Sequence, residues 1–229
     1  MSELKKCHQY FFSVEGENEK WYFEHLKKLI NTSDESMFNV DFKIKIEKSP
    51  VSRIKSINIP TFGNDKINVF HIVDYESNDK VHQSQFLGIL DELKKIKISH
   101  KNYNYRLGYS NFAFELWLLL HKNYSFASIA HRTHYMQPIN EAFGTNFIRL
   151  KDNKHKEPFE KLLAKIDLSN VKKAIETADS IRPIQVDNGY SMVEYKGFSY
   201  FRTNPDITIN ECVKRIFNDC KIDIFVKQI

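Results

Sequence analysis

Three carboxylates in the first half of the chain have the spacing that metal-dependent phosphoryl chemistry requires. Glu15 directly follows the apolar run QYFFSV, Asp74 ends the apolar run INVFHIVD, and Glu76 lies two residues further on. If the two runs are parallel neighbouring strands, their carboxyl ends meet at one crevice, where open α/β sheets bind ligands. Three carboxylates there repel one another and raise at least one pKa unless a cation is bound. Such hard oxygen ligands suit Mg²⁺ or Mn²⁺, which can activate water and stabilise charge on a phosphoryl group.

Each acidic residue also has a structural interpretation. Carboxylates after strands are common as helix N-caps and solvated turn residues. Glu19 lies one helical turn beyond Glu15, where it either faces the same site or interacts with the helix dipole. Glu115 stands among large apolar side chains, four residues after Asn111 on one predicted helix face, and belongs either to a site or to a structural ion pair.

The elements that must position these residues alternate between strand and helix. Apolar or alternating runs predict strands over residues 9–14, 40–48, 67–74 and 104–110. Apolar residues at helical spacing predict helices over residues 18–30, 85–98 and 112–122. This order is typical of an α/β fold, with a mixed sheet covered by helices on both faces.

The remainder of the chain is predicted to be mainly helical, with one hairpin. Residues 157–168 and 169–181 carry amphipathic stripes, and Asn188-Gly189 predicts a turn between the β-rich flanks of residues 184–201. We therefore expect a catalytic core over residues 1–150. We expect residues 151–229 to form a helical and hairpin extension packed on this core.

Composition sets broad limits on function. The 229 residues include 34 Lys and Arg against 29 Asp and Glu, a net charge of +5 that permits nucleic acid as a partner without requiring it. Three cysteines without Cys-x-x-Cys spacing indicate neither a disulfide framework nor a structural zinc site. No secretory signal or membrane span is evident, so we expect a cytoplasmic protein without a membrane partner.

Other candidate residues are basic or histidine. Lys151, Lys154 and Lys156 form a basic segment that either holds a phosphate or is a solvated loop. His121 is interpreted as a core or capping histidine. His131 and His134 lack a third partner at matching spacing for a transition-metal site.

The motifs resemble the TOPRIM signature, in which one apolar strand ends in Glu-Gly and a later one ends in Asp-x-Asp. The segment VEGENEKWYF (residues 14–23) is similar to the RloB family in particular, and SNFAFELWLLLH (residues 110–121) resembles the most distinctive block of that family. TNP (residues 203–205) matches its C-terminal motif. Three departures stand out: Glu76 replaces the second Asp, Asn18 replaces a Thr, and Phe112-Ala113 replaces Pro-Cys.

The resemblance implies a TOPRIM-like metal nuclease of bacterial antiphage or abortive-infection defence, with RNA such as tRNA among the substrates of related systems. It also implies an ATPase partner of the ABC or SMC type. Glu15, Asp74 and Glu76 would bind Mg²⁺ or Mn²⁺, Glu19 would assist, and Lys154 would contact phosphate because a lysine recurs near that position in the family. Asn111 and Glu115 would bind substrate.

Two other functions are compatible with the sequence. One is a non-catalytic nucleic-acid-binding or sensor subunit of an ATPase complex, in which the acidic cluster is solvated. The other is an oligomer-forming structural protein, which the polar surface composition disfavours. Homo-oligomerisation and the choice between DNA and RNA are left open by the sequence.

Overall fold

The computed structural model describes residues 5–57, 66–122, 129, 131–147 and 155–224. Its first half contains β1 (Cys7–Val14), α1 (Glu17–Thr32), β2 (Asn39–Ile46), α2 (Pro50–Lys55), β3 (Ile67–Asp74), α3 (Lys80–Ser99), β4 (Tyr103–Asn111) and α4 (Glu115–Leu120). Its second half contains the 3-10 helix η1 (Arg132–Tyr135), α5 (Met136–Phe143), α6 (Lys156–Leu163), α7 (Leu168–Asp187), β5 (Val193–Tyr195), β6 (Phe198–Tyr200), β7 (Asp206–Ile207) and α8 (Ile209–Cys220). None of the helices in these ranges has the length and apolar character of a membrane span.

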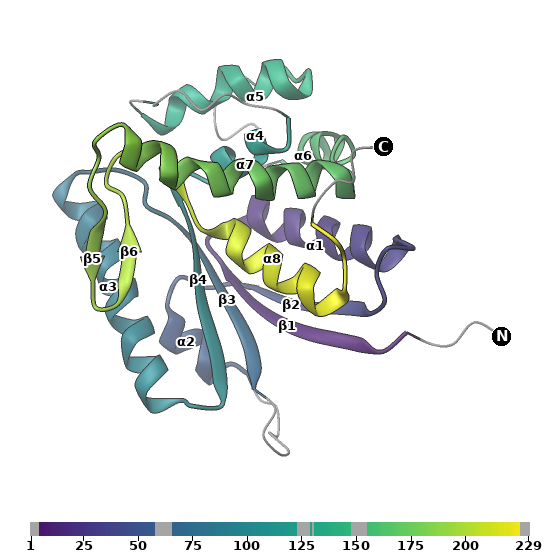
Figure 1. Cartoon of the computed structure of the whole chain (residues 1–229), viewed down its shortest axis with the longest axis horizontal. Coiled ribbons are helices and arrows are strands. Elements are labelled where there is room, and N and C mark those ends of the chain that lie inside the picture. The colour runs from purple at the N-terminus through teal and green to yellow at the C-terminus, as the bar shows by residue number, and fades with distance from the viewer. Residues whose placement is uncertain (1–4, 58–65, 123–128, 130, 148–154, 225–229) are drawn as a thin grey trace.

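One mixed sheet organises the fold, with the strand order β2-β1-β3-β4-β7 (Figure 1). The first four strands are parallel, and the short β7 runs antiparallel to β4. The predicted strands at residues 9–14, 67–74 and 104–110 are therefore neighbours, as expected, and the first two are parallel. Their carboxyl ends lie at one edge of the sheet.

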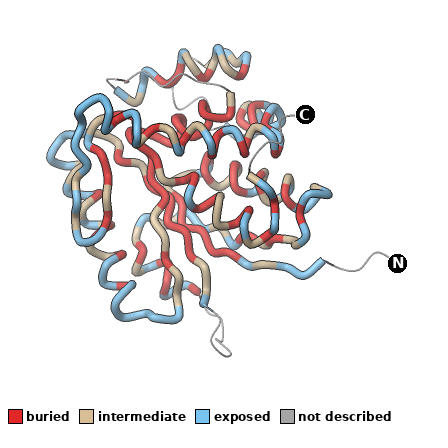
Figure 2. The backbone as a smooth tube through the Cα atoms, in the orientation of Figure 1, coloured by how far each residue is buried: buried red, intermediate tan, exposed pale blue. Residues whose placement is uncertain are grey.

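Helices cover both faces of the sheet, which confirms the expected mixed α/β architecture. Alternate strand residues point to opposite sides because the side-chain period of a strand is two. On one face, Phe12 and Ile72 join a cluster that includes α1 and α4 to α8. On the other, Phe11 and Val73 pack with α2, α3 and the β5–β6 hairpin. The strands form a buried band with exposed residues outside it (Figure 2).

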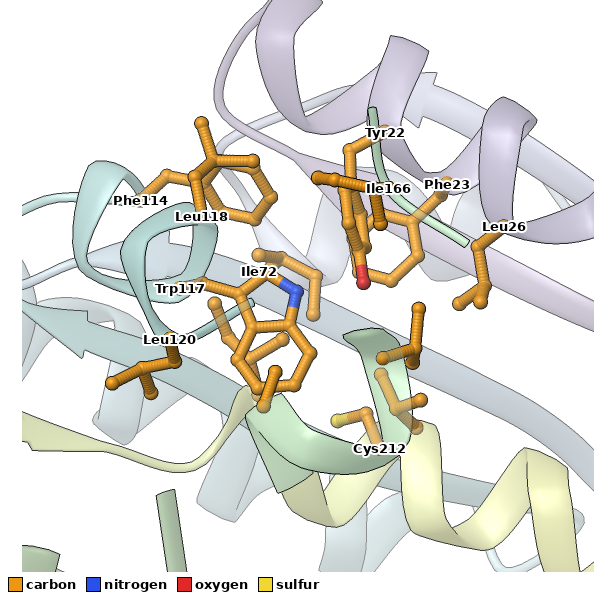
Figure 3. Close-up of a cluster of buried hydrophobic side chains, with 14 of the residues drawn as sticks. Tyr22, Phe23, Leu26, Ile72, Phe114, Trp117, Leu118, Leu120, Ile166 and Cys212 are labelled. Carbon is orange, nitrogen blue, oxygen red and sulfur yellow. The ribbon is translucent and has the colours of Figure 1, made fainter. Parts of the chain in front are cut away.

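The block SNFAFELWLLLH supplies the centre of the larger cluster. Its helix is shorter than predicted, because α4 begins only at Glu115. Trp117 is fully buried and lies among side chains from α1, β3 and α8, including Tyr22 and Cys212 (Figure 3). His121 is a satisfied core histidine, as expected. Its ring nitrogens lie 3.1 Å from the Tyr22 hydroxyl and 2.8 Å from the Trp117 carbonyl oxygen, and burial lowers its pKa to about 4.

The C-terminal residues complete the sheet. Asp206 and Ile207 pair with the end of β4, and α8 follows immediately. Asp206 is fully buried, accepts hydrogen bonds from Arg182 Nε at 2.8 Å and from the Phe201 amide at 2.9 Å, and is also bonded to the Tyr109 hydroxyl. The buried carboxylate is thus paired with a guanidinium, as burial of a charge requires.

The predicted hairpin turn at Asn188-Gly189 is wrong. Helix α7 continues to Asp187, and Asn188-Gly189 ends it: the two amides donate to carbonyls within the last turn, and Gly189 has a φ of +80°. Asn-Gly serves a helix C-terminus as well as a hairpin turn, because both need positive φ. The actual hairpin turns at Lys196-Gly197, where φ is +50° and +84°.

Two glycines should respond oppositely to the addition of one methyl group. A Cβ on Gly108 of β4 would lie 2.8 Å from Ile72 Cδ1 and 3.1 Å from Cys212 Sγ, so Gly108→Ala should destabilise the fold by about 1–3 kcal/mol through overpacking. Gly88→Ala in α3 meets no atom within 4 Å and should stabilise it by roughly 0.5–1 kcal/mol. Urea unfolding measures both free energies. Equal midpoints for the two variants would contradict the packing of β4 against α8.

Candidate functional site

A cavity of about 200 Å³ opens at the carboxyl edge of the sheet. It lies where β1 and β3 end and where α1 and α4 begin. Its lining residues are Glu15, Gly16, Glu17, Asn18, Glu19, Lys48, Asp74, Glu76, Phe114, Glu115 and Arg132. Six of these eleven side chains are carboxylates, so the cavity is strongly acidic.

Five of the seven predicted site residues meet in this cavity. They are Glu15, Glu19, Asp74, Glu76 and Glu115. Asn111 does not line it, and Lys154 lies outside the described residues. Lys156 begins α6 and pairs with Glu160 at 3.7 Å, and it is not among the lining residues.

Asn111 has a different position from the one predicted. It is the last residue of β4, not a helical residue on one face with Glu115. Its amide nitrogen donates to the carbonyls of Phe201, Arg202 and Thr203 at 2.9–3.3 Å. Its own carbonyl accepts hydrogen bonds from Tyr135 and Asn204.

Asn204 belongs to the TNP motif, so two of the segments that carry the family resemblance are bonded to one another. The Asn204 side chain also donates to the Tyr135 hydroxyl at 2.7 Å and accepts from the Ile129 amide at 2.8 Å. We call this buried network of Asn111, Tyr135 and Asn204 the asparagine latch. The latch holds the end of β4 in place, four residues before Glu115. It therefore helps to position Glu115 at the cavity without lining the cavity itself.

Burial, reinforced by repulsion between carboxylates, sets the electrostatics of the cavity. Burial raises the pKa of Asp74 well above its usual value, and the charges of Glu19, Glu15 and Glu115 raise it further. The Ser110 hydroxyl, which donates to Asp74 Oδ1 at 2.9 Å, opposes this shift. Burial likewise raises the pKa of Glu15, against the opposing charge of Lys48. Protonation or a bound cation would relieve this repulsion.

Glu76 is held in a strained conformation. Its φ of +60° lies in the left-handed region, which costs a residue other than glycine about 1–2 kcal/mol. Its carboxylate lies 3.3 Å from Arg132 Nη1 and 3.0 Å from His82 Nε2. Hydrogen bonding to Asp79 raises the pKa of His82, and the negative charge of Glu76 raises it further. Local strain of this kind persists where the surrounding structure imposes it, and it clusters at functional sites.

Three basic side chains at the site were not predicted from the sequence. Lys48 Nζ lies 4.0 Å from Glu15 Oε1, while Arg132 and His82 contact Glu76. Lys48 follows a half-exposed strand and His82 lies in the first turn of α3, so neither stands in a distinctive sequence pattern. Arg132 lies between His131 and His134 in the sequence, and only the tertiary fold brings it to the cavity.

The donor set fits a hard divalent cation in its chemistry. All the candidate ligands are carboxylate oxygens, as Mg²⁺ and Mn²⁺ prefer, and burial with neighbouring carboxylates raises the pKa of both Glu15 and Asp74. As positioned, however, no three Asp, Glu, His or Cys side chains in the described ranges are gathered closely enough to hold one ion. Glu76 would have to exchange its contacts with Arg132 and His82 for the metal.

Comparison with known proteins agrees with the motifs. A family model described as RloB-like protein matches residues 10–216. The chain belongs to the RloB-like family. The match covers most of the chain and includes all seven predicted site residues of this RloB-like protein, which confirms the resemblance inferred from the sequence. No curated protein and no solved structure is significantly similar to the chain.

The acidic cavity should make Asp74→Asn more stable than the wild type in the presence of EDTA. The raised pKa of Asp74 means that the folded state binds its proton more tightly than the unfolded chain. The contribution of Asp74 to the free energy of unfolding therefore falls as the pH rises from about 4, the pKa of an unfolded Asp, through the raised pKa of the folded state. At pH 7 we expect a gain of roughly 1 kcal/mol, the scale of a single buried-charge substitution.

Thermal unfolding from pH 4 to pH 8 measures this effect, with Asp34→Asn on the exposed loop after α1 as the matched control. Mn²⁺ should raise the midpoint of the wild type more than that of Asp74→Asn. Parallel pH profiles for all three proteins would contradict the electrostatic assignment.

Proposed function

We propose that this RloB-like protein is a metal-dependent phosphodiesterase that hydrolyses nucleic acid. The observation that carries the proposal is the convergence of Glu15, Asp74 and Glu76 on one acidic cavity at the carboxyl edge of a parallel sheet. Ligands bind at this edge in open α/β sheets. Family membership supports the proposal through the TOPRIM-like motifs.

In this proposal Asp74, Glu76 and Glu15 hold Mg²⁺ or Mn²⁺, which when bound polarises the phosphoryl group and lowers the pKa of water. Glu15 is the candidate general base as well as a ligand, because its raised pKa brings it closer to the operating pH. Glu19 and Glu115 are both buried at the cavity wall and supply further negative charge. Ser110 orients Asp74 through its hydrogen bond.

Lys48 and Arg132 are the proposed phosphate contacts among the described residues. Both line the cavity, and the Lys48 side chain is 68% exposed, so it is free to move toward a ligand. Arg132 now contacts Glu76 at 3.3 Å. If Glu76 bound a metal instead, the Arg132 guanidinium would be free to pair with phosphate, for which its planar fork is suited. Lys154 keeps its predicted role as a further contact.

The biological setting follows from the family resemblance. We propose that the protein acts in antiphage or abortive-infection defence with an ABC- or SMC-type ATPase partner. RNA, including tRNA, and DNA are both candidate substrates.

A second candidate function is a non-catalytic nucleic-acid-binding or sensor subunit. The contacts of Glu15 with Lys48, and of Glu76 with Arg132 and His82, favour it, because the protein's own cations partly neutralise the cavity. In this case binding to nucleic acid would depend on surface cations and not on a metal.

Glu15→Gln should separate the two candidates. We expect it to lower Mg²⁺- or Mn²⁺-dependent cleavage at least about 100-fold, the usual contribution of a general base, and to leave binding within about 2-fold. Cleavage and binding of labelled single-stranded RNA and DNA measure this, with Glu24→Gln on the exposed face of α1 as control. Ca²⁺ should support binding with little turnover.

If the wild-type protein, with its ATPase partner, binds equally well in EDTA and never cuts, the sensor function is correct. Full metal-dependent cleavage by Glu15→Gln would instead remove Glu15 from the mechanism.

Arg132→Ala and Lys154→Ala should each weaken binding and lower cleavage. Loss of one phosphate contact should reduce the slope of log K against log salt concentration by about 1. Lys156→Ala is the control, because Lys156 is an exposed cation outside the cavity. Unchanged slopes would show that these cations do not touch the backbone. Salt titrations from 50 to 300 mM give the slopes.

A further inference from the structure

A second, larger hollow opens from the same carboxylates. Its volume is about 420 Å³, within the range of pockets that hold small organic ligands. It shares Glu15, Lys48, Asp74 and Glu76 with the acidic cavity. A ligand with one end at these carboxylates therefore has the second hollow directly beside it.

The second hollow has different walls from the acidic cavity. One wall is the start of α2, where the Ser49 hydroxyl and the Val51 amide donate to Glu92 at 2.7 and 3.1 Å. The other wall is the exposed face of α3, where Gln85 offers an amide and Ile89 an apolar surface. Besides the three shared carboxylates and Glu92, this hollow is lined by Tyr75, Phe86, Gly88 and Ile89, which give it an apolar side that the first cavity lacks.

Gly88 is an exposed residue of the α3 wall, between Gln85 and Ile89 in the sequence. A Cβ there would meet no atom within 4 Å, so nothing packs against this point of the helix. Glycine within a helix costs about 1 kcal/mol relative to alanine, and unlike Gly108 this one is not required by close packing. A flat group can therefore lie close to the helix backbone at Gly88.

We propose that this hollow binds one nucleobase of the substrate, next to the phosphate that the carboxylate site processes. The inference rests on the proposed function and specifies its substrate. A nucleotide has the required chemistry, since it joins an anionic phosphate to a planar, partly apolar group with hydrogen-bonding edges. Lys48 lines both hollows and lies where the two parts of such a ligand meet.

The base in this hollow must be unpaired. A base within a duplex has both faces stacked and its pairing edge occupied, so it cannot lie on α3 and reach Gln85. The substrate is therefore single-stranded, or has a base turned out of the helix, next to the cleaved phosphate.

Gly88→Leu tests the inference, because leucine is a good helix former that fills the hollow. We expect at least a 10-fold increase in KM for a single-stranded oligonucleotide, with kcat within about 2-fold. Ser84→Leu, one turn earlier on the same helix and outside the lining, places the same side chain elsewhere and should change neither constant. Gly88→Ala should have an intermediate effect on KM and raise thermal stability.

Direct binding separates this inference from the proposed function. AMP, CMP, GMP and UMP are titrated against ribose 5-phosphate and inorganic phosphate by calorimetry in Ca²⁺. At least one nucleotide should bind 10-fold more tightly than ribose 5-phosphate, and Gly88→Leu should abolish the difference. Equal affinities for nucleotides and ribose 5-phosphate overturn the inference even if the protein cleaves nucleic acid. Base-dependent binding that Gly88→Leu removes supports it even if no cleavage is found, which would refute only the proposed function.

Discussion

Parallel pairing of β1 with β3 brings the carboxylates together. Tyr10 is aligned with Asn68 and Ser13 with His71, so the two strands end side by side and deliver Glu15 and Asp74 to the same edge. Antiparallel pairing would send them to opposite ends of the sheet. The resulting repulsion is the cost that the surrounding structure must offset. This repulsion is reduced by basic side chains near Glu15 and Glu76, namely Lys48, Arg132 and His82. It is also reduced by the hydrogen bond that Ser110 donates to Asp74.

The acidic cluster could be predicted from the sequence because its cause is local. Apolar runs identify buried strands, and residues that directly follow parallel strands share an edge. Glu19 was predicted from its spacing of one helical turn from Glu15, and Glu115 from its position among large apolar side chains; both line the cavity. The cations could not be predicted in this way. Lys48 and Arg132 reach the cavity from the end of β2 and from η1, and no local periodicity distinguishes them from solvated cations.

Two predictions were wrong, the helical position of Asn111 and the hairpin turn at Asn188-Gly189, and both failed because local sequence does not show tertiary contacts. Asn111 was assigned to a helix because the run from residue 112 to 122 is mostly apolar, and periodicity does not mark where the preceding strand ends and the helix begins. The misplaced hairpin turn reflects the two uses of Asn-Gly, at helix ends and in hairpins. In both places the deciding contacts are tertiary: Asn111 bonds to residues 201–204, and α7 contributes to the larger core cluster through Ala178 and Ile181.

The asparagine latch and β7 give the fold an order of assembly. Chains emerge from the ribosome N-terminal end first and fold progressively. Strands β1 to β4 are thus available early, whereas Asn204 and β7, which secure the end of β4, are made much later. The end of β4 can be secured in its final position only after residues 204–207 have been made. A prematurely terminated product that retains Glu15, Asp74 and Glu115 but ends before residue 204 would have the acidic residues without the structure that positions them.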